Sequence, residues 1–238
     1  MRFPIRFTSD FQLGVAARIA RTRGRKPLIL RPAVDSGVAD SLPNVESVPS
    51  LVWIGGIEPL EHPEISKFAN AVAASGREVF LQTNGKLFRR RVHEFQPSPR
   101  LRLAFRFAGA SIGTAENADV VEAIRIAKLS GFLTVGFTVL GAPSGIEASI
   151  ALHSQLKKLD LDGSLIFAAD TTAELNRVAA VARGRLLDGR WSNLSRVFNE
   201  AGYRAWVRIT ARAATPAERR LAAQATGTDL DLDEGAQA

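Results

Sequence analysis

Two short stretches in this sequence of 238 residues contain the residues best suited to bind a ligand. "GGIEP" (55–59) follows the apolar run 51–54, and "TNG" (83–85) follows the apolar run 78–82. Glycine lets a backbone approach a ligand closely, and a carboxylate accepts hydrogen bonds from amino groups. The candidate binding residues are therefore Gly55, Gly56, Glu58, Pro59, Thr83 and Asn84. The structural alternative is that the glycines serve a turn, Glu58 caps nearby backbone and "TNG" begins a helix.

Two arginines form a second candidate group. "RLRLAFRF" (100–107) alternates strictly, which predicts a strand with Leu101, Leu103, Phe105 and Phe107 on its helix-covered face. Arg102, Ala104, Arg106 and Ala108 then lie on the opposite, inner face. Arginines in an interior need anions. Either they pair with internal carboxylates such as Glu58, or they bind an anionic ligand, or this face is open and they meet water.

The sequence contains no cysteine, which excludes disulfides, thiolate zinc sites, cysteine nucleophiles and ordinary iron–sulfur ligation. The three histidines, His62, His93 and His153, are too far apart to form a local metal motif. We interpret His62 and His153 as structural residues. No metal site and no [4Fe–4S] cluster are expected.

Charge and hydropathy set the class of protein. The net charge of +7 is spread along the chain and accompanies no nucleic-acid motif, so nucleic acid is not an expected partner. "FRRRVHEF" (88–95) is either an anion-binding patch or a solvated helix face. No apolar run could span a bilayer, and a short helix over 10–23 offers at most peripheral membrane contact. The start lacks a continuous apolar region, which predicts a cytoplasmic protein.

The elements that must position these residues alternate between strand and helix. Strands are predicted over 27–30, 51–54, 78–82, 100–107, 133–140 and 164–168, with helices over 63–76, 85–95, 116–130 and 145–159. This alternation indicates parallel βαβ units in an α/β fold. Beyond residue 170 we predict helices over 172–188, 192–201 and 215–225, with a strand over 203–209.

The order of these motifs resembles the radical SAM superfamily, which cleaves S-adenosylmethionine (SAM) with a [4Fe–4S] cluster. A strand, GGxEP, "LEHPEI" (60–65) opening a helix, another strand and "TNG" occur in the family's order. "RGRKPLIL" (23–30), 86–109 and 121–139 are similar to the branch that contains adenosylhopane synthase, a hopanoid-lipid enzyme. The similarity covers about residues 10 to 170 and implies a partial (βα)6 barrel with its site at the carboxyl ends of the strands.

The resemblance also implies domain boundaries and a damaged site. The barrel would cover 1–170, a mostly helical C-terminal extension with one strand 171–226, and a disordered tail 227–238. The family's CxxxCxxC loop corresponds to "RPAVDSGVADS" (31–41), which has no cysteine, and the first barrel helix is expected to be reduced or absent. Ile57 replaces a glycine that precedes the family's glutamate, and Ala108 stands before Gly109 where an acidic contact is expected.

These departures predict a pseudoenzyme of radical SAM type, without the family's reaction. It would act as partner, scaffold or regulator of an active enzyme in hopanoid or other lipid biosynthesis, or as a homo-oligomer. Such a partnership predicts an exposed apolar patch where the first barrel helix is missing. The alternative is a binding protein or non-redox enzyme that uses the former cleft for SAM, a nucleotide or another anionic small molecule, through Arg102 and Arg106.

Overall fold

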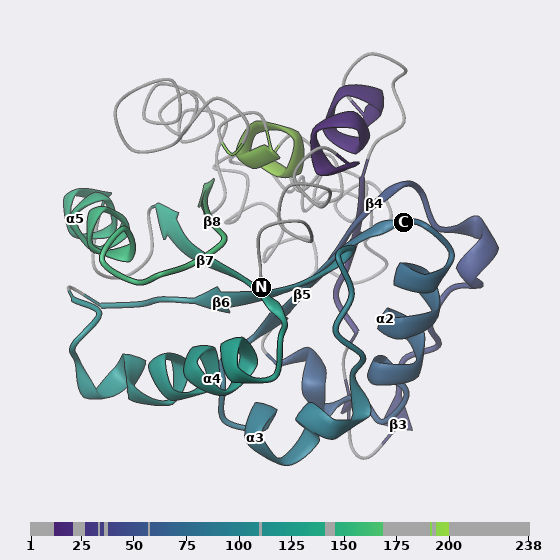
Figure 1. Ribbon diagram of the computed structural model, residues 1–238, viewed down its shortest axis with the longest axis horizontal. Helices are drawn as coiled ribbons and strands as arrows, with labels where there is room; N and C mark the ends of the chain where they lie inside the picture. Colours follow the sequence, from purple (N-terminus) through teal and green to yellow (C-terminus); the bar gives the residue numbers. More distant parts are fainter. Residues whose placement is uncertain are drawn as a thin grey trace, which may run out of the picture.

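A six-stranded, all-parallel, curled sheet forms the centre of the computed structural model (Figure 1). The structure describes residues 12–20, 27–32, 34–35, 38–56, 58–109, 111–140, 146–168, 191 and 194–199. The strand order is β1-β4-β5-β6-β7-β8, so each strand lies beside the next long strand of the sequence. The architecture is therefore an α/β half-barrel, as predicted.

All six predicted strands are present. They are β1 (Leu28–Leu30), β4 (Leu51–Ile54), β5 (Glu78–Thr83), β6 (Leu101–Arg106), β7 (Leu133–Leu140) and β8 (Gly163–Ala168). The register sets Trp53 beside Phe80, and Phe80 beside Arg102. Since parallel neighbours end at the same edge of a sheet, the loops after β4 and β5 lie together there.

One helix follows each of the strands β4, β5, β6 and β7 along the chain. They are α2 (Ile65–Ala74), α3 (Phe88–Arg91), α4 (Ala118–Leu129) and α5 (Ile146–Leu156). Single 3-10 turns precede α2 and α4, namely η2 (Pro59–Glu61) and η4 (Ala115–Asn117). The helix predicted over 85–95 is shorter than expected. Gly85 has a φ of 88°, outside helical values, and α3 tightens into the 3-10 turn η3 (Val92–Glu94) before Phe95 becomes extended.

The connection from β1 to β4 differs from a complete barrel unit. It contains a small antiparallel hairpin of β2 (Val34–Asp35) and β3 (Val38–Ala39), where we predicted only loop. Among its described residues the only helical segment is η1 (Val45–Ser47), in agreement with a reduced first helix. Leu42, Val45 and Val48 pack against the core there, and β1 is half-buried. The exposure of residues 33–38 lies outside what the structure describes, so the exposed apolar patch expected at this place stays a prediction.

Two hydrophobic cores lie on the two faces of the sheet. The outer core packs α2, α3, α4 and α5 against the convex face and includes Leu101, Leu103, Phe105 and Phe107, as predicted. The inner core covers the concave face, where helices 12–20 and 194–199 lie on the side away from α2, α3 and α4 (Figure 1). Both helices fall within predicted ones.

The predicted helices 172–188 and 215–225, the strand 203–209 and the tail 227–238 lie outside the described residues. The domain boundaries at 170 and 226 consequently stay predictions. No described helix has the length and apolar character needed to cross a membrane.

Candidate functional site

The two glycines of "GGIEP" lie directly after β4, at the carboxyl edge of the sheet. Gly55 N donates to Leu30 O at 2.8 Å, which continues the pairing of β4 with β1. Gly56 has a φ of 124°, which favours glycine, and its carbonyl accepts a hydrogen bond from Gln82 Nε2 at 2.5 Å. Ile57 lies outside the described residues. The glycine turn is thus held by neighbouring strands on both sides.

Gly55 is crowded by side chains of the protein itself. A Cβ at this position would lie 2.4 Å from Trp53 Nε1 and 2.9 Å from Gln82 Oε1. Real Cβ atoms do not approach other atoms so closely, so a larger residue here would require the side chains of Trp53 and Gln82 to shift. The space that a glycine-rich turn opens to a ligand is here filled by Trp53 and Gln82.

Glu58 uses both carboxylate oxygens within the fold. Oε1 accepts from Leu60 N at 3.1 Å and caps η2, in which Pro59 is the first residue. Oε2 accepts from Asn84 N at 2.7 Å and from Thr83 Oγ1 at 3.1 Å. Burial raises the pKa of Glu58, and these three hydrogen bonds lower it in part. This geometry agrees with the interpretation of Glu58 as a cap that joins the loops after β4 and β5.

The "TNG" stretch forms the turn into α3. Thr83 Oγ1 also accepts from Gly85 N at 3.1 Å, and Asn84 Oδ1 accepts from Lys86 N at 3.0 Å. Gly85 is required twice, because its φ is 88° and a Cβ would lie 2.6 Å from Asp119 O at the start of α4. Turn formation therefore accounts for the whole stretch.

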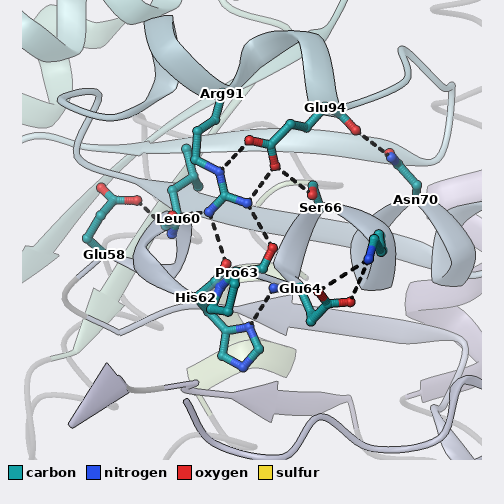
Figure 2. Close-up of polar contacts among 10 residues, drawn as sticks. Glu58, Leu60, His62, Pro63, Glu64, Ser66, Asn70, Arg91 and Glu94 are labelled. Atoms are coloured by element: carbon teal, nitrogen blue, oxygen red, sulfur yellow. Dashed lines mark hydrogen bonds and ion pairs between the residues drawn. The ribbon is translucent and has the colours of Figure 1, made fainter. Parts of the chain in front are cut away.

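Arg91, which was not among the predicted site residues, holds the loop between β4 and α2 in place (Figure 2). Arg91 Nε and Nη2 donate to Glu94 Oε1 and Oε2 at 2.8 and 2.5 Å. The same guanidinium donates to the carbonyls of Leu60, His62 and Pro63. Glu94 also accepts from Ser66 Oγ, and Arg91 lowers the pKa of Glu94 to about 2. "FRRRVHEF" thus divides into a structural Arg91 and the exposed Arg89 and Arg90.

The two inner-face arginines of β6 have different surroundings. Arg102 is buried, and its Nη1 donates to Glu78 Oε2 at 2.6 Å. Its guanidinium also lies over the ring of Phe80, at 5.5 Å from the centroid. Among the alternatives, pairing with an internal carboxylate describes Arg102, but the partner is Glu78 rather than Glu58. Glu78 was not predicted as this partner. Strand alternation nevertheless sets Glu78 on the same face as Phe80, and Phe80 is the register neighbour of Arg102.

Arg106 is exposed at the carboxyl end of β6. No hydrogen bond or ion pair joins its side chain to another residue that the structure describes. The open-face alternative therefore applies to Arg106, which remains accessible to an anion.

Aromatic rings cover the concave face of the sheet. Trp53 lies within 5.8 Å of the ring centroids of Phe80, Phe137, Phe167 and Phe198. Leu13 and Ala17 of helix 12–20 and Leu194 of helix 194–199 complete this inner core. The described part of the half-barrel interior is therefore packed with apolar side chains.

The residues present do not fit a [4Fe–4S] cluster, which the resemblance implies for the loop after β1. Thiolates are the usual ligands of such clusters, and the chain has none. The backbone carbonyl of Asp40 in this loop accepts from His62 Nε2 at 2.8 Å, while His62 Nδ1 accepts from Glu64 N. The described residues contain no group of three or more His, Cys, Asp or Glu side chains suited to a metal ion.

His153 lies apart from this edge, buried between α5 and β7. Its Nδ1 is 3.2 Å from Thr138 Oγ1, and burial lowers its pKa to about 4. Its position agrees with the structural role that we predicted.

Comparisons with known proteins give no family for this chain: no protein-family model matches it, and no curated protein is similar to it.

Proposed function

We propose that this chain is a catalytically degenerate relative of radical SAM enzymes that acts as partner, scaffold or regulator of an active enzyme. The family assignment rests on the order of GGxEP, "LEHPEI" and "TNG" along a parallel half-barrel. The pathway, hopanoid or other lipid biosynthesis, rests on the sequence resemblance alone.

The observation that carries the non-catalytic part is the packing at Gly55. Trp53 and Gln82 occupy the space beside this glycine, and the rings of Phe80, Phe137 and Phe198 continue the packing behind Trp53. Glu58, the acceptor expected to meet a ligand, is buried and receives three hydrogen bonds from the protein. A cofactor at this place would have to displace well-packed aromatic side chains, at a cost of several kcal/mol.

The proposal is tested with a cysteine-containing relative encoded in the same genome. We expect the two purified proteins to form a complex in size-exclusion chromatography, and deletion of this chain to reduce the relative's product in cells. Anaerobic treatment of this chain with iron and sulfide should give no cluster absorption, with the relative as positive control. A chain that stays monomeric beside the relative, and whose deletion leaves the lipid profile unchanged, would contradict the proposal.

A second candidate function is supported by the exposure of Arg106. This arginine lies on the inner face at the carboxyl edge, where a half-barrel protein would bind an anionic small molecule. Arg102 is less suited than expected because Glu78 already neutralises it. Calorimetry with SAM, S-adenosylhomocysteine and ATP should give binding that Arg106→Ala removes and Arg90→Ala, at an exposed site on α3, does not. The absence of heat with all three compounds would exclude these ligands.

A further inference from the structure

Among the described residues, side chains of helix 194–199 lie along the edge of β8 that faces away from β7. In the part of the chain that the structure describes, β8 is the last strand of the sheet and its one strand partner is β7. Ile166 N donates to Ser195 Oγ at 3.0 Å, and Asn199 Nδ2 donates to Ile166 O at 2.9 Å. Unpaired strand edges are templates for pairing with a further strand. These two contacts occupy both backbone groups of Ile166 and so prevent such pairing at this residue.

The same segment covers the concave face. Phe198 lies 5.4 Å from Trp53 and 5.2 Å from Phe80 between ring centroids. Trp191 lies against Gly163 of β8, where a Cβ would be 1.9 Å from Trp191 Cζ2. The segment, here called the plug and defined as Trp191 with residues 194–199, therefore covers the edge of β8 and part of the concave face.

The attachment of the plug differs from that of the strands it covers. It joins β8 through side-chain hydrogen bonds and ring contacts, without a backbone ladder. Its described helix is too short to be stable by itself in water, so its order depends on these contacts. Segments held in this way open at a lower free energy than the central strands of a sheet.

We propose that the plug is a built-in strap that opens locally while the sheet stays folded, and that its opening controls access to the concave aromatic face. The ligand class admitted by the open state is a flat apolar or aromatic compound, because the plug contacts the rings of Trp53, Phe80 and Phe167 and its opening would uncover them. Opening of the plug does not require the proposed partnership.

Two substitutions in the full chain test the strap. Ser195→Ala removes the acceptor for Ile166 N. Asn199→Asp removes the amide that donates both to Ile166 O and to Ser195 O. Each should raise the hydrogen-exchange rate of the Ile166 amide about tenfold or more, Ser195→Ala because the acceptor of this amide is lost and Asn199→Asp because the plug opens more easily. Exchange in β4, β5 and β6 should stay at wild-type rates. Ser154→Ala, which removes an exposed hydroxyl from α5, is the matched control. It should change neither the exchange rate of the Ile166 amide nor exchange in β4, β5 and β6.

The dye anilinonaphthalene sulfonate reports on access. We expect its fluorescence to increase with Ser195→Ala and Asn199→Asp, while the far-ultraviolet circular dichroism of the sheet and helices is kept. Gly163→Ala should act likewise, since the new methyl group displaces Trp191. Unchanged exchange at Ile166 in both variants, or dye binding equal to that of wild type, would overturn the proposal.

Native-state exchange of the wild-type chain gives an answer even where a variant fails to fold. At low urea the Ile166 amide should exchange through a local opening that is nearly independent of urea. The amide of Val135 in β7 should exchange through global unfolding. The same urea dependence for both amides would show that the plug does not open separately, and would contradict the strap.

Discussion

Arg102 Nη1 lies 2.6 Å from Glu78 Oε2, and both side chains are almost completely buried inside the half-barrel. Arg100 Nη1 reaches the other carboxylate oxygen of Glu78 at 2.7 Å from a partly exposed position. The pair lies at the start of β5 and β6, whereas Glu58 follows the carboxyl end of β4. One carboxylate thus holds a buried guanidinium far from the candidate site.

Glu78→Gln should lower the free energy of unfolding by about 3 kcal/mol, because it leaves the Arg102 charge buried without its counter-charge. Urea denaturation with an unchanged m-value measures the loss. Glu122→Gln, an exposed position on α4, is the control and should stay within about 0.5 kcal/mol of wild type. The combined change Glu78→Leu and Arg102→Met should lower the free energy of unfolding less than Glu78→Gln does, since the buried charge of Arg102 is removed together with its partner. A larger loss in the combined variant would show that the ion pair itself is stabilising.

Arg91→Lys should lower the stability by about 2 kcal/mol, because a lysine cannot keep the bidentate contact with Glu94 and the carbonyl contacts together. Arg90→Lys on the same short helix is exposed and should have little effect. Glu94 has its pKa lowered to about 2, so its stabilising effect is complete above the ordinary carboxyl pKa of 4.5 and is lost as the pH falls toward 2. The difference in Tm between wild type and Arg91→Lys should therefore become smaller as the pH is lowered between these values, which thermal unfolding measures. A constant difference would indicate that packing of the arginine stem dominates.

Gly85→Ala and Gly76→Ala separate backbone strain from close approach. Both glycines have positive φ, 88° and 91°, but a Cβ at Gly76 meets nothing within 4 Å, whereas at Gly85 it meets Asp119 O at 2.6 Å. Gly76→Ala should cost about 1 kcal/mol, and Gly85→Ala about 2 kcal/mol more, since α4 must shift. Equal losses in chemical denaturation would mean that the contact with α4 relaxes freely.

His153 should make stability fall as the pH is lowered. Burial lowers its pKa from 6.5 to about 4, so the unfolded chain takes up the proton first. The contribution is complete above pH 6.5 and decreases by about 3 kcal/mol down to pH 4. His153→Gln should remove this part of the pH dependence, and His93→Gln, at an exposed position, should keep it. A pH profile of His153→Gln parallel to that of wild type would contradict the burial of a neutral ring.

The strands were predictable because each is a short apolar run followed by glycine, proline or polar residues, as at 51–54 and 133–140. The helix over 85–95 was predicted too long because apolar spacing does not reveal the positive φ of Gly85. The hairpin of β2 and β3 was missed since its strands have two residues each, too few for a period. Arg91 was missed because its partners Leu60, His62 and Pro63 are distant in sequence and are backbone carbonyls of any residue type.

The sequence by itself determined the parallel half-barrel and the two faces of β6, because alternation and strand–helix spacing are local properties of the chain. It also determined that no thiolate could hold a cluster. Only the tertiary structure decided the partners of the candidate residues. Glu58 binds the turn after β5, Arg102 pairs with Glu78, and Trp53 fills the space beside Gly55. These outcomes depend on which distant side chains share one curved face of the sheet, and that follows from strand register and curvature rather than from spacing along the chain.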